Sequence, residues 1–480
     1  MKVMNRVTLK HLFKNKKRTL VTLIGTIVSV AMIMAVATLG FSFMDFMQQA
    51  AIADGGSWHV RYRNLTAEQV AAVGNDSETV DMTLQHYLGY TKLKGGQNKN
   101  KPYLLLQATD KKGFSLLPFH LTSGRMPENG NEVVISEHIA TNGGVEYKIG
   151  DVLRLEVGQR YCNEDLVGGK PLTGAKPLYN DVSYGATDGN ETILTDGTVQ
   201  EFTVVGIMGR PGTENYSGPG YTVLTYENQK DISAQGDVDA YVTVKHLTSD
   251  IYDYANDLAE RNGIEHIALN NDLLRYSGVF ENDTMRSTLY SFMAIIILII
   301  MVGSVALIYN AFAISVSERA RNLGMLSSIG ATKRQKRNSV FFEGFLIGLI
   351  SIPLGILFGY LGIRVTMVFI APLLESTFYV PAVPIEFRAV ITPVTVIVST
   401  VLSAVTIFIS VYIPAKRASR VTPIDAIRQT QDVKLRSKDV KTSKVTRKLF
   451  GFEAEIGLKN LKRNRKRYRV TVFSLSLIHI

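Results

Sequence analysis

The residues whose types and spacing suggest a specific task lie between Ser317 and Arg337, in a polar and basic segment between two long apolar runs. Leu323, Leu326 and Ile329, with Met325, recur at helical spacing, so we expect them on one side of a short helix. The charged residues are expected off that side: Glu318, Arg319, Arg321, Lys333 and Arg334. Such a helix would lie flat at a membrane surface and end at Gly330-Ala331-Thr332. The chemistry is that of an apolar contact flanked by charges; an ordinary basic loop is the alternative.

No set of residues has the spacing of a catalytic or metal site. The histidines of the central region are scattered, without the short spacings typical of metal ligands: His59, His86, His120, His138, His246 and His266. No Ser-His-Asp combination or paired carboxylates stand out, and no Gly-x-x-x-x-Gly-Lys-Ser/Thr loop is present to hold nucleotide phosphates. We therefore assign no catalytic residue, no metal and no directly bound cofactor, and expect energy to come from a partner.

Four apolar segments must position this helix, because each exceeds the ~20 residues needed to cross a bilayer. They are residues 19–44, 288–314, 339–371 and 389–414, and a fifth starts at residue 470. Residues 1–18, 315–337 and 415–469 hold 31 Lys and Arg against 6 Asp and Glu, whereas residues 45–287 hold 20 against 33. The positive-inside rule therefore predicts that the first set is cytoplasmic and that residues 45–287 face outward.

The basic residues flank apolar spans, so we expect anionic lipid headgroups as their partner and no nucleic acid. The cluster from Lys333 to Arg337 would hold the start of the third span at the cytoplasmic face. Residues 1–18 predict an amphipathic basic helix on the inner leaflet. The alternative is the n-region of a cleaved signal peptide, but the apolar run to Met44 is about twice the usual ~7–15 residues. We expect a retained first span.

Residues 45–287 change to short alternating strands with turn residues between them, which predicts a mixed α/β domain. Strands are expected to start at Tyr103, Glu132, Asp151, Phe202 and Ala240, and helices to cover residues 66–73, 137–141 and 251–262. Cys162 is the only cysteine, so no intrachain disulfide is possible and an apolar core must hold this domain.

Two segments of this region stand apart. Residues 161–200, rich in Gly, Asn, Asp, Thr and Tyr, read as an insertion that is either a ligand-facing lobe or a variable surface excursion. From Leu273 to Thr288 we expect one helix that runs straight into the second span and forms a rigid stalk.

The third span contains glycines at the spacing that lets helix backbones approach closely in lipid: Gly344, Gly348, Gly355, Gly359 and Gly362. Pro353 in its middle predicts a kink. Tight packing is the favoured interpretation and a pore role is the alternative. We expect Glu343 to reach the headgroups rather than act in a relay, and Pro414 to stop the fourth span.

The sequence thus predicts a membrane protein: an α-helical transmembrane bundle, four spans plus the start of a fifth, with a large mixed α/β extracytoplasmic domain between spans 1 and 2. Its parts are expected to be a cytoplasmic amphipathic helix (1–18), the first span (19–44), the extracytoplasmic domain and stalk (45–287), the second span (288–314), a cytoplasmic coupling helix (315–338), the third span (339–371), an outer loop (372–388), the fourth span (389–414), a cytoplasmic linker with a second amphipathic helix (415–469) and the start of a fifth span (470–480).

Short motifs in three regions carry a resemblance to a known family. The first region combines Glu318-Arg319, Leu323-Gly324 and Ile329-Gly330-Ala331-Thr332; the second runs from Pro414 to Arg420 and then from Pro423 to Arg428. In the outer region, Gly124-Arg125, Glu132 to Ile135, Ile149-Gly150-Asp151 and Val204 to Ile207 follow in order. Together they resemble the coupling segment, the end of the fourth span and the extracytoplasmic core of the FtsX-like, or MacB-type, ABC transporter permeases.

The resemblance implies that the short helix docks on a separate ATP-binding subunit, expected as a dimer, so that ATP acts through that partner. The contact is then expected from the motif residues Glu318, Arg319, Leu323, Gly324, Met325, Leu326, Ile329 and Gly330. It implies a bacterial plasma-membrane permease that exports or extracts a lipid, peptide or antibiotic-like substrate. The alternative is a non-transporting signalling scaffold that regulates an outer hydrolase or a sensor kinase.

The end of the chain resembles its beginning. Residues 8–23 align without gaps on residues 457–472, with eight identities in sixteen positions. This predicts a duplication. Because few residues follow Arg469, we expect a fragment of a longer permease, similar to the duplicated Gram-positive members that include those handling antimicrobial peptides.

Overall fold

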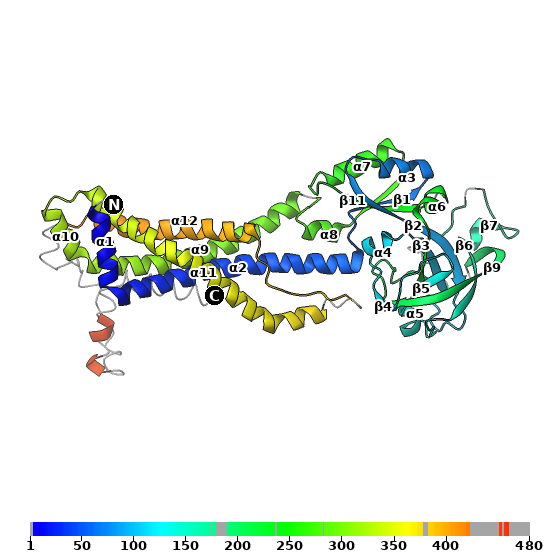
Figure 1. The fold of residues 1–480 in the computed structure, drawn as a ribbon, viewed down its shortest axis with the longest axis horizontal. Coiled ribbons are helices and arrows are strands. Elements are labelled where there is room, and N and C mark those ends of the chain that lie inside the picture. Colours follow the sequence, from blue (N-terminus) through cyan, green and yellow to red (C-terminus); the bar gives the residue numbers. More distant parts are fainter. Residues whose placement is uncertain are drawn as a thin grey trace. The chain divides into compact units, whose positions relative to one another are not determined.

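The computed structural model describes residues 3–173, 175–178, 190–235, 238–281, 283–377, 383–422, 451–453 and 456–459. The chain divides into two compact units (Figure 1). We call Met1–Ser42, Arg286–Ile370 and Arg388–Ile480 the helical unit, and Phe43–Met285 with Ala371–Phe387 the α/β unit. Each unit is described by itself below.

The helical unit is built from four long apolar helices. They are α2 (Lys16–Gly55), α9 (Asp283–Glu318), α11 (Lys333–Thr377) and α12 (Pro393–Ser419), and each is long and apolar enough to span a membrane. Two shorter helices join them, α1 (Val3–Lys14) and α10 (Ala320–Ser328). The expected fold class, four spans with a mixed α/β domain between the first and second, is confirmed. The expected fifth span and most of the second amphipathic helix lie outside the described residues.

Glycines of α11 lie where neighbouring helices come closest. A Cβ at Gly355 would lie 2.5 Å from Cβ of Val30 on α2, and one at Gly359 would lie 2.6 Å from the carbonyl oxygen of Ala31. On α12, Val411 and Ile407 lie 2.9 and 3.4 Å from Cβ positions built at Gly344 and Gly348. These distances are those of tight helix packing. The α11 helix continues through Pro353, which is exposed, and the kink there stays a prediction.

Pro414 does not stop the fourth span, contrary to the sequence prediction. It lies inside α12, which continues to Ser419. A proline in a helix interior removes one backbone hydrogen bond, at a cost of about 3 kcal/mol. Ala415 and Ala418 beyond it are fully buried in the core of the helical unit, beside Phe312 and Leu323. Burial of this last turn offsets the lost hydrogen bond.

The α/β unit is built on a ten-stranded sheet of order β12-β1-β11-β2-β3-β10-β5-β9-β4, with β6 paired to β2 and β9. The strands are β1 (Val60–Leu65), β2 (Thr79–Lys92), β3 (Tyr103–Thr109), β4 (Leu121–Gly124), β5 (Glu132–Ser136), β6 (Val152–Cys162), β9 (Glu191–Met208), β10 (Gly220–Tyr226), β11 (Val238–Val244) and β12 (His266–Leu269); β7 (Leu166–Val167) and β8 (Lys170–Pro171) form a separate hairpin. The five expected strands are present as β3, β5, β6, β9 and β11, but β9 begins at Glu191, well before the expected start at Phe202.

Short helices complete the apolar cores on which this unit depends. They are α3 (Ala67–Gly74), α4 (Gly113–Leu116), α5 (His138–Thr141), α6 (Gln229–Gln235), α7 (Ile251–Arg261) and α8 (Asn271–Tyr276). The expected helices are confirmed as α3, α5 and α7. One core packs side chains of α3 and α7 on β1 and β11, and a second lies on β3, β5 and β10. Cys162 is a buried free thiol.

The segment expected as an insertion is partly a regular β-ribbon. β6 and β9 pair antiparallel from Val152 with Thr203 to Cys162 with Glu191. Neither alternative for this segment is decided, because residues 174 and 179–189 lie outside the described residues.

The continuous stalk expected from Leu273 to Thr288 is wrong, because the helix breaks at Gly278. Gly278 has a positive φ of 85°, its N–H donates to Arg275 O (3.0 Å), and Val279 N–H donates to Leu274 O (2.9 Å). These two bonds form a Schellman motif, which ends α8. Val279 is then buried in the core of the α/β unit, so the chain turns inward before α9 begins at Asp283.

The last turns of α2 are held firmly within the α/β unit. The carbonyl of Gly55 accepts from Trp58 Nε1 (2.7 Å), and that of Ala53 lies 2.9 Å from His120 Nε2. Phe46 packs edge-to-face on Phe387, with ring centroids 5.3 Å apart. Because α2 is unbroken from Lys16 to Gly55, one helix contributes residues to both units.

Candidate functional site

The segment that the sequence singled out is a helix between two bends. α9 ends at Glu318, α10 covers Ala320–Ser328 and α11 begins at Lys333. Gly330, with φ 92°, donates to Ser327 O (3.2 Å) and Ala331 donates to Leu326 O (2.9 Å), which is again a Schellman motif. Thr332 and Gln335 then exchange side-chain and backbone hydrogen bonds and cap α11. The expected break at Gly330-Ala331-Thr332 is confirmed.

The sequence predicted that the apolar residues of this segment share one side of the helix, but in the structure they do not. Leu323 is buried in the core of the helical unit, whereas Met325 is 53% exposed and Ile329 is 80% exposed. Leu326 is half-buried and Gly324 is buried. The prediction fails because α10 is short: Ile329 is its C-cap residue, so helical spacing no longer governs its direction. α10 is therefore anchored by Leu323 and presents Met325 and Ile329 outward.

The start of α10 is fixed by a buried ion pair. Arg319 Nη1 contacts Glu343 Oε2 on α11, and Ser315 Oγ on α9 donates to Glu343 Oε1 (3.0 Å). Both charged side chains are less than a tenth exposed. Arg319 is therefore buried, and its expected part in the ATPase contact stays a prediction, whereas the expectation that Glu343 reaches the headgroups is wrong. A buried charge is stable only beside an opposite charge, and Arg319 and Glu343 supply that charge to each other.

The end of α10 is fixed by Lys336, which the sequence placed in a basic cluster at the membrane surface. Lys336 is buried, and its Nζ donates to Val421 O (2.8 Å), just after α12, and to Ser327 Oγ (3.3 Å). It is satisfied by backbone and hydroxyl oxygens rather than by headgroups. Its exposed neighbours Lys333, Arg334 and Arg337 keep the expected placement on the surface.

Three buried polar residues at the start of α11 thus collect the connections of this region. Lys336, Ser339 and Glu343 lie three and four residues apart, on one side of the helix. Ser339 Oγ shares a 2.7 Å hydrogen bond with Thr8 Oγ1 of α1. We call this set the polar stripe of α11. It joins α11 to α1, to the end of α9, to both ends of α10 and to the segment after α12.

The exposed part of the segment is an apolar contact surrounded by charge. Met325 and Ile329 form the apolar part, and Glu318, Arg321 and Asn322 on the preceding turns are also exposed. We call these five residues the α10 surface. It holds no nucleophile activated by a base, and an exposed apolar area bordered by charge suits contact with another surface.

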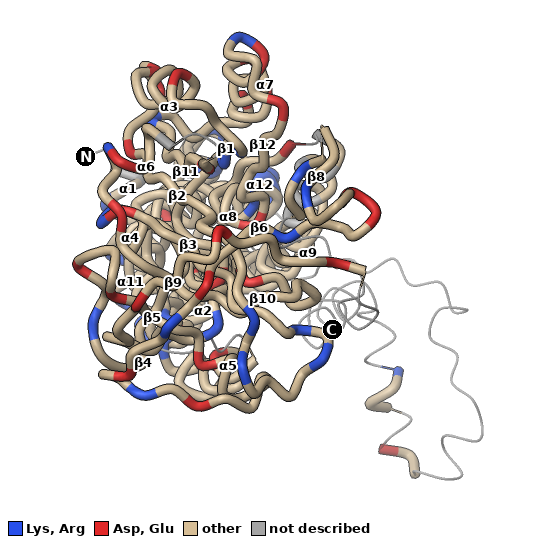
Figure 2. Tube along the Cα trace, turned by 90° about the vertical axis from the view of Figure 1, so that its right-hand side faces the viewer, with Lys and Arg blue, Asp and Glu red and all other residues tan. Residues whose placement is uncertain are grey.

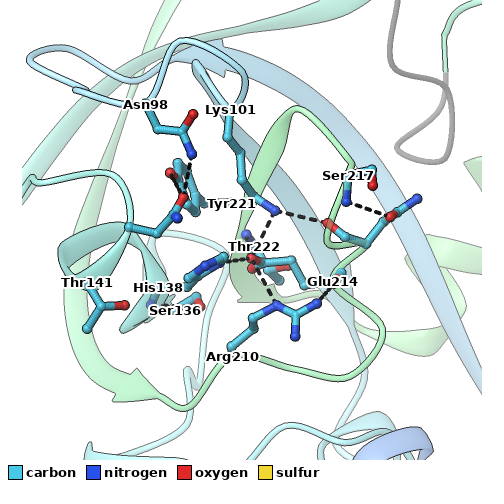
Figure 3. A network of polar contacts seen from close by, with 12 residues as sticks. Asn98, Lys101, Ser136, His138, Thr141, Arg210, Glu214, Ser217, Tyr221 and Thr222 are labelled. Atoms are coloured by element: carbon cyan, nitrogen blue, oxygen red, sulfur yellow. Dashed lines mark hydrogen bonds and ion pairs between the residues drawn. The ribbon is translucent and has the colours of Figure 1, made fainter.

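The α/β unit contains a buried polar network that the sequence did not suggest (Figure 3). The carboxylate of Glu214 lies 3.2 Å from Lys101 Nζ and 2.7 Å from His138 Nδ1, and it accepts from the backbone N–H of Thr222 (2.9 Å). Arg210 Nη2 donates to Glu214 O and stacks on Tyr216. Lys101 and Glu214 are 113 residues apart along the chain, so no local spacing could have indicated their contact.

Burial acts to raise the pKa of the Glu214 carboxyl, but His138, Lys101 and the Thr222 N–H outweigh it and hold that pKa below its ordinary value. Burial lowers the pKa of Lys101 more than Glu214 raises it. The network fixes the segment between β9 and β10. Among the described residues, no group of three or more His, Cys, Asp and Glu side chains is placed to hold a metal ion.

Comparison with known proteins places both halves of the chain. A family model of the FtsX-like permease C-terminal domain matches residues 294–423, and one of the MacB-like periplasmic core domain matches residues 19–251. The macrolide export ATP-binding/permease protein MacB of Neisseria meningitidis serogroup A is 23% identical over 440 residues, which cover 88% of this chain and 60% of that protein. The ABC transporter permease YtrF of Bacillus subtilis is 20% identical over 451 residues, covering 88% of this chain and 97% of YtrF.

A crystal structure of the periplasmic region of MacB from Actinobacillus actinomycetemcomitans aligns with 50% of this chain and 94% of its own, at 10% identity and a TM-score of 0.26. The chain spans 42% and 60% of the length of the MacB relatives of Campylobacter fetus and N. meningitidis serogroup A. The two domain models match in the order that the fold requires, with the periplasmic core before the permease domain. The chain therefore belongs to the FtsX-like, MacB-type permeases of ABC transporters.

Proposed function

We propose that the chain is the membrane subunit of an ABC transporter, in which a separate ATPase pushes on the α10 surface and the α/β unit moves outside the cell. The observation that carries the proposal is the double anchoring of α10. Arg319 with Glu343 holds its start, and Lys336 with Ser327 and Val421 holds its end. A helix fixed at both ends to neighbouring spans transmits a displacement instead of bending away from it.

The α10 surface suits a protein partner of defined chemistry. Met325 and Ile329 are large, exposed apolar side chains, and their burial against another surface would favour binding. Arg321 is exposed on the same helix, and Lys333, Arg334 and Arg337 are exposed at the start of α11. The partner is therefore expected to offer an apolar groove with acidic residues at its rim. In this proposal Arg319, Leu323 and Gly324 position the surface, while Glu318, Met325 and Ile329 touch the partner.

Transmission to the outside is proposed to follow α2. This helix has 40 residues, or about 60 Å at ~1.5 Å per residue, which is about twice the ~30 Å of a bilayer core. Its last turns are gripped within the α/β unit by Trp58, His120 and Phe387. The break at Gly278 makes α8 a poor candidate for this task, because it separates α8 from α9.

The substrate class that we propose is a lipid, a peptide or an antibiotic-like molecule. Its support is the family membership and the printed name of the MacB relatives, which is macrolide export. The proposed topology has the N-terminus, α10 and the segment after α12 in the cytoplasm. It rests on the excess of Lys and Arg in those segments.

The test is reconstitution of the full chain with its ATPase in proteoliposomes, followed by ATP hydrolysis and substrate flux. Ile329→Asp should abolish stimulation of the ATPase by the permease, because a charge replaces the apolar contact. Ile149→Asp is the matched control, since Ile149 is also exposed but lies in the α/β unit. Unchanged stimulation in Ile329→Asp would refute the proposed contact. Stimulation without flux of any substrate would refute transport and favour a signalling scaffold.

A further inference from the structure

The N-terminal helix α1 presents an unusual surface at the end of the helical unit. In Figure 1, α1 lies across the direction of α2 and α11, at the end of the bundle where α10 lies. Only four residues separate its end at Lys14 from Thr19, where the first candidate span begins. A helix that crosses the bundle direction next to the start of a span lies along the plane of the membrane surface.

One side of α1 faces the bundle and the other is both cationic and apolar. Thr8 is buried against Ser339, whereas Arg6, Lys10 and Lys14 are exposed at intervals of four residues. Phe13 and Val7 lie among them, 67% and 43% exposed. Side chains of both kinds on one exposed face suit the boundary between headgroups and acyl chains, where apolar groups enter and cations remain outside.

The positive charge of this region has no acidic counterpart. Residues 1–44 contain seven Lys and Arg and no Asp or Glu, and no ion pair joins Arg6, Lys10 or Lys14 to any other described residue. In the α/β unit, by contrast, acidic and basic residues are interspersed (Figure 2), and Arg125 and Arg154 pair with Glu132 and Glu201. The charge complement of α1 must therefore come from outside the described chain.

We propose that α1 is a binding surface for the anionic phospholipid headgroups of the adjacent leaflet, and that its contact with α11 makes ATPase coupling depend on lipid charge. The second part rests on the proposed function. The link is the Thr8–Ser339 hydrogen bond, because Ser339 lies in the polar stripe of α11 between Lys336 and Glu343, which hold the two ends of α10. Displacing α1 shifts the residue between these two anchors.

The first measurement is hydrogen exchange of α1 amides in the full chain, in nanodiscs of phosphatidylcholine alone or with phosphatidylglycerol. Exchange should be slower in the anionic discs, and salt at about 0.5 M should remove the difference. The triple variant Arg6→Gln/Lys10→Gln/Lys14→Gln should lose the slower exchange in anionic discs, because three basic residues strengthen association with an anionic surface on the order of a hundredfold. The control Lys92→Gln/Lys94→Gln/Lys99→Gln changes three exposed lysines of the α/β unit and should keep it.

Equal exchange in both lipids would overturn the proposal, as would equal loss in the control variant. Protection of α1 in phosphatidylcholine discs by added inorganic phosphate or by a short RNA duplex would also overturn it, because the site would then recognise a soluble anion. Protection by phosphatidylglycerol alone supports it.

The second measurement is ATPase stimulation in the same discs. Phosphatidylglycerol should change stimulation severalfold in the natural sequence, and Thr8→Val should remove this dependence while keeping the exchange protection. Protection without any lipid effect on stimulation would overturn the regulatory part. Absence of stimulation in every lipid would instead count against the proposed function, and the exchange data would still decide headgroup binding.

Discussion

Removing one partner of the Arg319–Glu343 pair should destabilise the helical unit at least as much as replacing both partners. Arg319→Met leaves a buried carboxylate that keeps the hydrogen bond from Ser315, and Glu343→Leu leaves a buried guanidinium. Breaking a buried pair costs about 3–5 kcal/mol, whereas replacing both partners with apolar side chains is often close to neutral. We therefore expect about 3 kcal/mol for each single variant.

The double variant Arg319→Met/Glu343→Leu should cost no more than about 3 kcal/mol, rather than the about 6 kcal/mol expected from independent sites. The assay is unfolding of the full chain in lipid bicelles, followed as a double-mutant cycle. The control is the exposed pair Arg154 and Glu201 of the α/β unit, where truncation to Met and Leu should cost about 1 kcal/mol or less. Additive costs at Arg319 and Glu343 would contradict this prediction, because the two charges would then not depend on each other.

Three further predictions concern packing, a turn and a buried acid. Gly355→Ala should destabilise the bundle by about 1–3 kcal/mol in the same bicelle assay, because its Cβ would meet Val30 at 2.5 Å, whereas Gly362→Ala, with no atom within 4 Å, should be neutral or slightly stabilising. Gly330→Ala should cost about 1 kcal/mol and lower ATPase stimulation in proteoliposomes, since φ is 92° there; Gly457→Ala, with open space and no positive φ, is its control. The pKa of Glu214 is lowered in the folded protein. Its ionised carboxylate therefore contributes fully to the free energy of unfolding above the ordinary pKa of about 4.3, and this contribution is lost as the pH falls through the lower pKa of the folded state. Thermal unfolding of the α/β unit in the full chain should therefore lose stability below about pH 4, and Glu214→Gln should remove this part of the pH dependence.

The sequence predicts the four spans and the outer strands well because both depend on local pattern. Apolar length alone marks the spans, and short runs rich in apolar residues mark β3, β5 and β11. It also predicts the end of α10, because Gly330 and Thr332 carry local turn and cap chemistry. The prediction fails where tertiary contacts determine the helix ends. Burial of Val279 turns the chain inward at Gly278, and burial of Ala415 and Ala418 favours continuation of α12 beyond Pro414.

In the candidate site, too, the sequence predicts what depends on local pattern but not what depends on tertiary contacts. The motif residues from Glu318 to Gly330 mark the position of α10, but their roles depend on contacts that the sequence does not display. Arg319 and Glu343 are separated by 24 residues and two bends, and Lys336 meets Val421 across 85 residues. From the sequence we expected the three charged residues, Arg319, Lys336 and Glu343, at the surface, because charged side chains near the end of a span usually reach the headgroups. Only the fold shows that they hold α10 in place.

The most direct test of the proposed contact is cross-linking of the α10 surface to the ATPase. Ile329→Cys would be placed in the full chain, where the single natural cysteine, Cys162, is buried, and Ile149→Cys would serve as the control. A short bifunctional reagent should join Ile329→Cys to the ATPase, with a yield that changes between the nucleotide-free and ATP-bound states, while Ile149→Cys stays free. Equal yields at the two positions, or no product at Ile329→Cys under conditions in which the ATPase copurifies with the chain, would contradict the proposed contact.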